Sequence, residues 1–209
     1  MLDRRALFGA SAAIIASAAL ALSGCAASDP LADQAKAGDG KNYIAGDGSV
    51  TEYAVDQRGG TVQFAGALLN GQNVDAKTFK GKVTVLNFWY AACAPCRLEA
   101  PDLEALNQEF TPQGALFYGV NVRDDVANAD AFARTFKTTY PSFKDKDGAV
   151  LLAVSSFVPP SAVPTTLVLD KEGRVAARIL GVADKSTLKA LISSALAEGK
   201  TAEGNSAQK

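Results

Sequence analysis

Runs of apolar and β-branched residues, separated by polar turns, divide the chain into predicted strands. Two of them, residues 83–90 and 115–122, are almost unbroken, which is typical of strands covered on both faces of a sheet. The first is therefore expected at the centre of the sheet. A shorter run ends at the turn signal Asn70-Gly71, and two more flank a polar loop and predict an antiparallel hairpin. These three shorter strands are expected at residues 62–69, 165–169 and 175–180.

Apolar residues recur at helical spacing after each long run, and again near the end of the chain, where Asp184 is a suitable N-cap. The order is β-α-β-α followed by β-β-α. It predicts an α/β protein of the thioredoxin-like fold, with a central mixed sheet flanked by helices. The apolar positions are Leu103, Leu106 and Phe110 in the first helix, Ala129, Phe132, Ala133 and Phe136 in the second, and Leu188, Leu191, Ile192, Ala195 and Leu196 in the third.

The first 24 residues are typical of an export signal, with Arg4 and Arg5 before the uncharged, mostly apolar run 6–22. The sequence Leu22-Ser23-Gly24-Cys25 resembles the lipobox of bacterial lipoproteins, which implies that Cys25 is lipidated and becomes the first mature residue. The alternatives are an uncleaved helical anchor over residues 6–28 and ordinary signal cleavage. All three place the domain outside the cytoplasm, and the lipobox anchors it to the outer face of the cell membrane. Export by the Sec or the twin-arginine route stays open.

The amino-acid composition changes at both ends of the predicted domain. Residues 25–60 are rich in Ala, Gly, Asp, Ser and Lys and poor in large apolar residues, so a flexible tether is expected there. The same argument predicts a disordered tail at 198–209. The thioredoxin-like domain is accordingly expected at residues 61–197.

Charge and histidine content exclude several classes of function. The formal net charge is -1 and the basic residues are scattered singly among acids, so the chain is not expected to bind nucleic acid. The sequence contains no histidine, which removes the commonest metal ligand and general base. No metal site is therefore expected.

The motif Cys93-Ala94-Pro95-Cys96 directly follows the central strand and opens the next helix. The unpaired N–H groups and the dipole of a helix N-terminus favour the Cys93 thiolate, so Cys93 is expected to attack. Cys96, one turn later and expected to be more shielded, resolves the mixed disulfide. Zinc would need two further ligands that the chain does not offer, and a purely structural disulfide closing so short a loop would stabilise little. The expected redox group is the Cys93–Cys96 disulfide itself, with no other cofactor.

The segment from Gly81-Lys82 through Asn87-Phe88-Trp89 to the CxxC motif, with Arg97, Glu99 and Pro101 after it, resembles the TlpA/ResA-type family of extracytoplasmic thiol-disulfide oxidoreductases. The resemblance covers about residues 62–196. It implies that Pro164, in Val163-Pro164-Thr165-Thr166, forms a cis peptide bond in a loop that faces the dithiol and docks an extended substrate. The alternative is a trans proline at the start of a strand.

The resemblance also bears on proton transfer. Classical thioredoxins carry a buried aspartate where this chain has Asn87, which cannot take a proton. The family nominates Glu99, which shares a helical face with Cys96, as the carboxylate that tunes the thiols. The alternative is an exposed helix glutamate. Before the first cysteine, Tyr90-Ala91-Ala92 replaces the usual small residue and later Trp, so the choice of partner is left open.

The function implied is disulfide exchange with exported client proteins through the CxxC dithiol, including reduction of apocytochrome c to its thiol form with electrons from a membrane thiol carrier. One alternative is an extracytoplasmic oxidant that introduces disulfides. Another, of a different class, is a redox-inert binding module that keeps the fold as a scaffold. A peroxide-reducing protein fits less well, because its attacking cysteine does not normally sit in a CxxC motif.

We expect Cys25 to carry lipid and the protein to partition with membranes. Mass spectrometry of the N-terminal peptide of the mature protein measures the modification directly. A freely soluble protein whose mature N-terminus lies away from Cys25 would refute the lipobox interpretation and leave the chemistry of the domain untouched.

Overall fold

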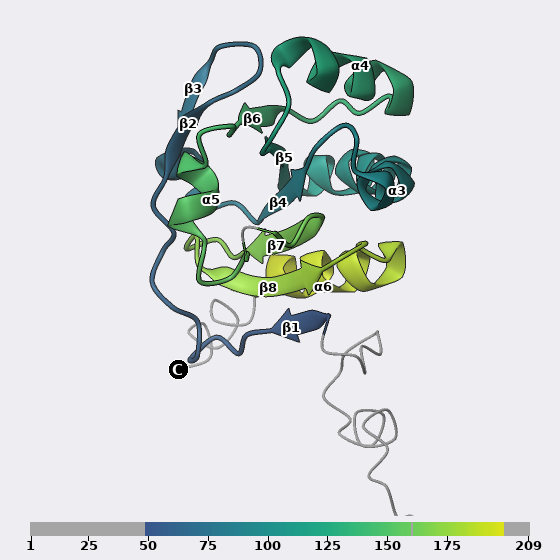
Figure 1. The fold of residues 1–209 in the computed structure, drawn as a ribbon. Coiled ribbons are helices and arrows are strands. Elements are labelled where there is room, and N and C mark those ends of the chain that lie inside the picture. Colours follow the sequence, from purple (N-terminus) through teal and green to yellow (C-terminus); the bar gives the residue numbers. More distant parts are fainter. Residues whose placement is uncertain (1–48, 160, 199–209) are drawn as a thin grey trace, which may run out of the picture. The chain divides into compact units, whose positions relative to one another are not determined.

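The computed structural model describes residues 49–159 and 161–198, which belong to one compact unit. In this part of the chain, a mixed sheet has the strand order β1-β8-β7-β4-β5-β6 (Figure 1). Strands β4, β5 and β6 are parallel, whereas β7 is antiparallel to both β4 and β8, and β8 pairs with β1. The bounds are β1 Val50–Glu52, β4 Thr84–Trp89, β5 Leu116–Asn121, β6 Ser142–Lys144, β7 Thr165–Leu169 and β8 Val175–Leu180.

The helices and a small hairpin cover the two faces of this sheet. The face that carries the hairpin β2–β3 also carries α5, whereas α3 and α6 cover the opposite face (Figure 1). The hairpin consists of β2 (Ala65–Ala67) and β3 (Asn73–Asp75). The helices are η1 Ala76–Phe79, α3 Ala94–Phe110, η2 Thr111–Gln113, α4 Val126–Phe136, α5 Ala149–Ala153 and α6 Lys185–Ala197.

Alternation along the central strands creates a core on each side. Leu86 and Phe88 of β4 point into the core beneath the hairpin and α5, whereas Val85 points into the core beneath α3 and α6. Asn87 therefore lies on the same face as Val85, under α3. A polar group at this position is covered by a helix and needs hydrogen-bond partners inside the protein.

The long apolar runs predicted their strands well. Residues 83–90 and 115–122 form β4 and β5, the hairpin β7–β8 is present, and Asp184 caps α6 by accepting a hydrogen bond from the Thr187 N–H. The predicted strand at 62–69 is shorter, because only 65–67 pair with a neighbour. The sequence pattern does not predict the three-residue strands β1, β3 and β6 or the short helix α5, because elements of three to five residues are too short to show a period.

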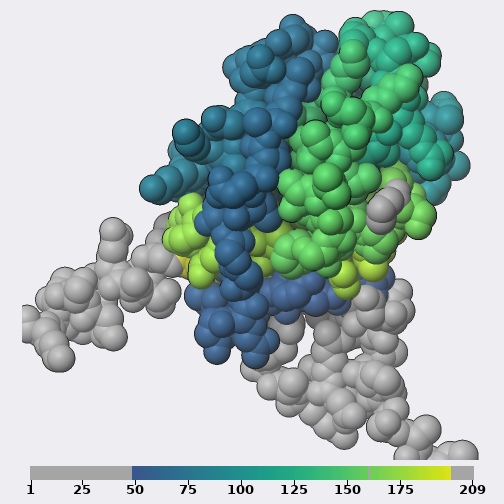
Figure 2. Space-filling view, turned by 60° about the vertical axis from the view of Figure 1, so that its left-hand side comes forward, coloured from purple at the N-terminus to yellow at the C-terminus, as the bar shows by residue number. Residues whose placement is uncertain are grey.

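The domain begins earlier than the predicted boundary at residue 61. Residues 50–52 pair with β8, and the chain then runs as a blue band over the surface up to η1 (Figure 2). Arg58 is buried, with 3% of its side chain exposed, and pairs with Asp170 at 3.0 Å and with both carboxylate oxygens of Glu198. Residues 50–58 and Glu198, predicted as tether and tail, thus belong to the fold because this ion-pair cluster fixes them. The remainder of both predicted flanks lies outside the described residues.

Among residues 49–159 and 161–198, no helix has the length and apolar character needed to cross a membrane.

We expect Arg58→Met to lower the free energy of unfolding by about 2–3 kcal/mol, because it removes one of the two cations that pair with the buried Asp170 among the described residues. Urea denaturation of the oxidised protein measures this change. The matched control, Lys185→Met, breaks an exposed pair with Asp102 at 3.5 Å and should cost no more than about 0.5 kcal/mol. Equal effects of the two substitutions would contradict a stabilising role for the buried cluster.

Candidate active site

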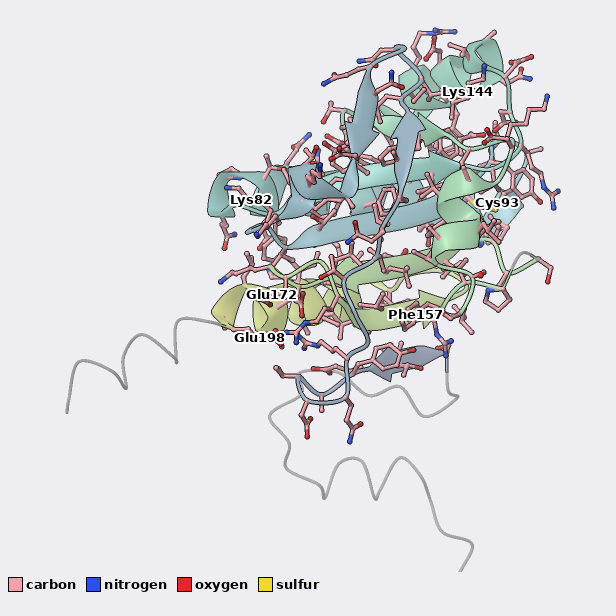
Figure 3. All side chains as sticks on the ribbon, turned by 90° about the vertical axis from the view of Figure 1, so that its left-hand side faces the viewer. Lys82, Cys93, Lys144, Phe157, Glu172 and Glu198 are labelled. Atoms are coloured by element: carbon pink, nitrogen blue, oxygen red, sulfur yellow. A yellow bond between two sulfur atoms is a disulfide. The ribbon has the colours of Figure 1, made fainter. Side chains whose placement is uncertain are left out.

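Cys93 and Cys96 form a disulfide at the carboxyl end of β4, with their Cα atoms 5.3 Å apart. Cys93 is the N-cap of α3, and its Sγ accepts a hydrogen bond from the Cys96 N–H at 3.1 Å. Pro95 lies in the first turn, where its missing N–H costs nothing. Figure 3 shows Cys93 and Lys82 at opposite ends of the sheet, since they flank β4. Because Cys93 is the N-cap of α3 and Cys96 lies in its first turn, both sulfur atoms lie where the helix N-terminus favours negative charge.

Both cysteines are equally buried, at 2% exposure each. The expectation that Cys96 is the more shielded of the two is therefore wrong for the disulfide form. The reason is packing, because one apolar cluster surrounds the whole disulfide. Its buried members are Trp89, Ala100, Ala129 and Phe132, and Leu69, Tyr90, Ala91, Phe136 and Val163 pack against it.

The loop before β7 meets this cluster through Val163, and the Val163–Pro164 peptide bond is cis, as predicted. Pro164 is buried, and its carbonyl oxygen accepts a hydrogen bond from the Gly181 N–H at 2.9 Å. The residue before the cis proline thus packs against the cluster that contains the disulfide. Docking of an extended substrate on this loop stays a proposal.

Glu99 is buried at 1% exposure, so it is not an exposed helix glutamate. Its Oε1 accepts a hydrogen bond from Asn87 Nδ2 at 2.8 Å, and its Oε2 accepts one from the Ala183 N–H at 2.7 Å. Asn87 Nδ2 also donates to Thr166 Oγ1 at 3.1 Å. The carboxylate thereby joins α3 to β4 and to the loop before α6.

Burial raises the pKa of Glu99 to about 7, because desolvation outweighs the two hydrogen bonds from Ala183 and Asn87, which lower it. Cys96 and Glu99 are three residues apart in α3 and lie on one face of the helix. A carboxyl group with a pKa near neutrality is thus buried on the face of α3 that carries Cys96.

Asp124, which the sequence analysis did not single out, fixes the loop before Cys93. Its Oδ2 accepts hydrogen bonds from the Ala91 N–H at 2.6 Å and from Asn121 Nδ2 at 2.8 Å. Because β4 and β5 are parallel, their carboxyl ends meet at one edge of the sheet. The acid that follows β5 could have been placed at this edge from the predicted topology.

In the part of the chain that the structure describes, no group of three Cys, Asp or Glu side chains could hold a metal ion. Cys25, the predicted lipidation site, lies outside the described residues.

Comparisons of this chain with known protein families and known proteins identify its relatives. The model of the AhpC/TSA family matches residues 61–178. The thiol-disulfide oxidoreductase ResA of Geobacillus thermodenitrificans is 35% identical over 121 residues, which are 58% of this chain and 67% of the relative. The resemblance to the TlpA/ResA-type family is thereby confirmed.

Two solved structures share the fold. A secreted thiol-disulfide isomerase from Corynebacterium glutamicum matches with a TM-score of 0.65 and 29% identity, over 75% of this chain and 97% of the other. A DsbF homologue from Corynebacterium diphtheriae matches with a TM-score of 0.61 and 31% identity, over 74% of this chain and 98% of the other. These matches confirm the predicted thioredoxin-like fold.

We expect Glu99→Gln to change how stability depends on pH in the oxidised protein, where the cysteines cannot titrate. The folded-state pKa of Glu99 is raised from 4.5 to about 7. Its contribution to stability is therefore complete below pH 4.5 and is lost as pH rises through 7. Relative to the variant, the wild type should lose roughly 3 kcal/mol of unfolding free energy between about pH 4.5 and 8.

Urea denaturation at several pH values measures both proteins. A constant difference between wild type and variant across this range would contradict the raised pKa of Glu99.

Proposed function

Because this chain belongs to the AhpC/TSA family, we propose that its Cys93–Cys96 pair exchanges disulfides with exported client proteins. The chain is a thiol-disulfide oxidoreductase with a thioredoxin-like fold. The observation that carries the proposal is the disulfide between the N-cap of α3 and a residue in its first turn. In that position the helix dipole favours the thiolate that exchange requires.

The exchange has two steps. In the reduced protein, the Cys93 thiolate attacks one sulfur of a client disulfide, forming a mixed disulfide and releasing the other client sulfur as a thiolate. Cys96 then attacks the Cys93 sulfur, breaking the bond to the client, whose second sulfur also leaves as a thiolate. Two electrons have passed to the client, and the protein holds the disulfide observed here.

We assign to Glu99 the proton that Cys96 must lose before the second step. Its carboxylate shares a helical face with Cys96. The neighbouring buried side chain, Asn87, is an amide and cannot accept the proton. The pKa of about 7 lets Glu99 accept a proton and release it again near neutral pH.

The same carboxylate favours reduction of the client over oxidation. A negative charge close to the thiols raises their pKa and disfavours the thiolate. Strong oxidants of this fold owe their potential to a stabilised reduced form. Glu99 acts in the opposite sense, because it destabilises the reduced form and so favours donation of electrons. This argues against the alternative of an oxidant that introduces disulfides.

The N-terminal sequence and the relatives support a proposal for the location and partners of the protein. We place the protein outside the cytoplasm, held to the outer face of the cell membrane by lipid on Cys25. Its clients are exported proteins with thiols or disulfides, among them apocytochrome c. A membrane thiol carrier returns electrons to the Cys93–Cys96 pair. The relative that is itself called secreted supports an extracytoplasmic site of action.

A redox-inert binding module is disfavoured by the intact cysteine pair, because such a module has no need of a disulfide at a helix N-terminus. The pair closes a loop of only two intervening residues, which stabilises a fold little.

We expect Cys96→Ser to accumulate a covalent complex with a disulfide-bonded model peptide, because Cys93 still attacks and nothing resolves the intermediate. Cys93→Ser, the matched control, should form no such complex. Non-reducing electrophoresis and mass spectrometry of the adduct give the result. If both variants retained wild-type exchange rates, the pair would not be the redox centre.

A further inference from the structure

Two guanidinium groups lie at the rim of the disulfide, each over an aromatic ring. Arg123 Cζ is 4.2 Å from the centre of the Tyr90 ring, and Arg97 Cζ is 5.7 Å from the centre of the Phe136 ring. Both rings pack against the buried cluster that contains the disulfide. The two charges come from different elements, since Arg97 belongs to α3 and Arg123 to the loop after β5.

These two arginines are exposed, and neither forms an ion pair within the described residues. Stacking on an aromatic face restricts a guanidinium before any ligand arrives, so less rotamer freedom is lost on binding. A guanidinium also presents paired N–H donors that match the two oxygens of a carboxylate. The rim therefore offers two prepared contacts for acidic side chains.

The acids beside Arg123 are engaged elsewhere. Asp124 accepts the Ala91 N–H at 2.6 Å, and Asp125 caps α4 by accepting the Asn128 N–H at 2.9 Å. Glu99 is buried beneath the surface. Across the site, residues 154–163 before the cis proline contain no charged side chain. These nearby acids therefore leave both guanidinium groups available to a ligand.

We propose that Arg97 and Arg123 select client segments that carry Asp or Glu within a few residues of the exchanged cysteine. The inference rests on the proposed function, because it concerns which clients the same disulfide exchanges with. The client lies between the stacked arginines and the loop of Pro164, and its carboxylates contact the guanidinium groups while the mixed disulfide forms. The chemistry of exchange is unchanged.

A positive charge near Cys93 also favours its thiolate, and that effect is the same for every client. Selection must therefore be measured as a ratio of rates between clients and not as a rate alone. In such a ratio, any general change in thiol reactivity cancels.

The test uses three disulfide-bonded peptides that differ only in the residues flanking the cysteine, which are Glu, Gln or Lys. Stopped-flow oxidation of the reduced protein gives a second-order rate constant for each. We expect the Glu peptide to react about three- to tenfold faster than the Gln peptide, and the Lys peptide more slowly, as one or two exposed ion pairs allow. The preference should shrink at high salt.

The double variant Arg97→Gln, Arg123→Gln should bring the Glu-to-Gln ratio close to one. Lys82→Gln is the matched control, because Lys82 is an exposed cation at the opposite end of β4, and it should keep the wild-type ratio (Figure 3). Arg97→Lys with Arg123→Lys separates charge from geometry, and we expect it to retain only part of the preference.

The outcomes distinguish this inference from the proposed function. If the wild type does not exchange even the Gln peptide, the proposed function fails. If it exchanges all three peptides at equal rates, or if the double variant keeps the full preference for Glu, the selection by Arg97 and Arg123 is refuted and the function stands.

Discussion

A single buried carboxylate joins the parts of this protein that have to meet at the disulfide. Glu99 reaches from α3 to Asn87 of β4 and to the backbone of Ala183 before α6. Through Asn87 the network also includes Thr166 of β7, which follows the cis proline by two residues. Burying a carboxylate is costly, and each of its oxygens has one N–H donor in return. The arrangement therefore favours one placement of the helix over the sheet, and with it one placement of both cysteines.

The loop between β4 and α3 is fixed from the other side by the end of β5. Asp124 holds the Ala91 N–H, while the Tyr90 carbonyl accepts the Cys93 N–H at 3.1 Å. Parallel pairing of β4 with β5 makes this possible, since it brings the loops after both strands to one edge. Tyr90, with Arg123 over its ring, packs against the cluster that contains the disulfide. An aromatic ring and a positive charge thus lie together beside this cluster.

The strength of the local pattern decided how much could be predicted. Buried strands such as β4 show long apolar runs, and the CxxC motif after one of them located the disulfide and the start of α3. Strand β1 has three half-buried residues, and its pairing with β8 joins segments more than a hundred residues apart, so no local period reveals it. The burial of Glu99 was equally hidden. The residues that enclose it, Asn87 and Ala183, come together only through the tertiary fold.

Glu99 and the two rim arginines carry charges of opposite sign in different environments. Glu99 lies inside the protein, where the effective dielectric constant is low and solvent salt screens its charge little. Arg97 and Arg123 lie at the surface, where water and ions weaken their influence on sulfur but leave them accessible to a client. In the function proposed here, the interior charge governs the redox preference while the surface charges govern recognition of the client. Because the two sets of residues share no hydrogen bond, a substitution at the rim can alter the range of clients with little effect on the direction of electron transfer.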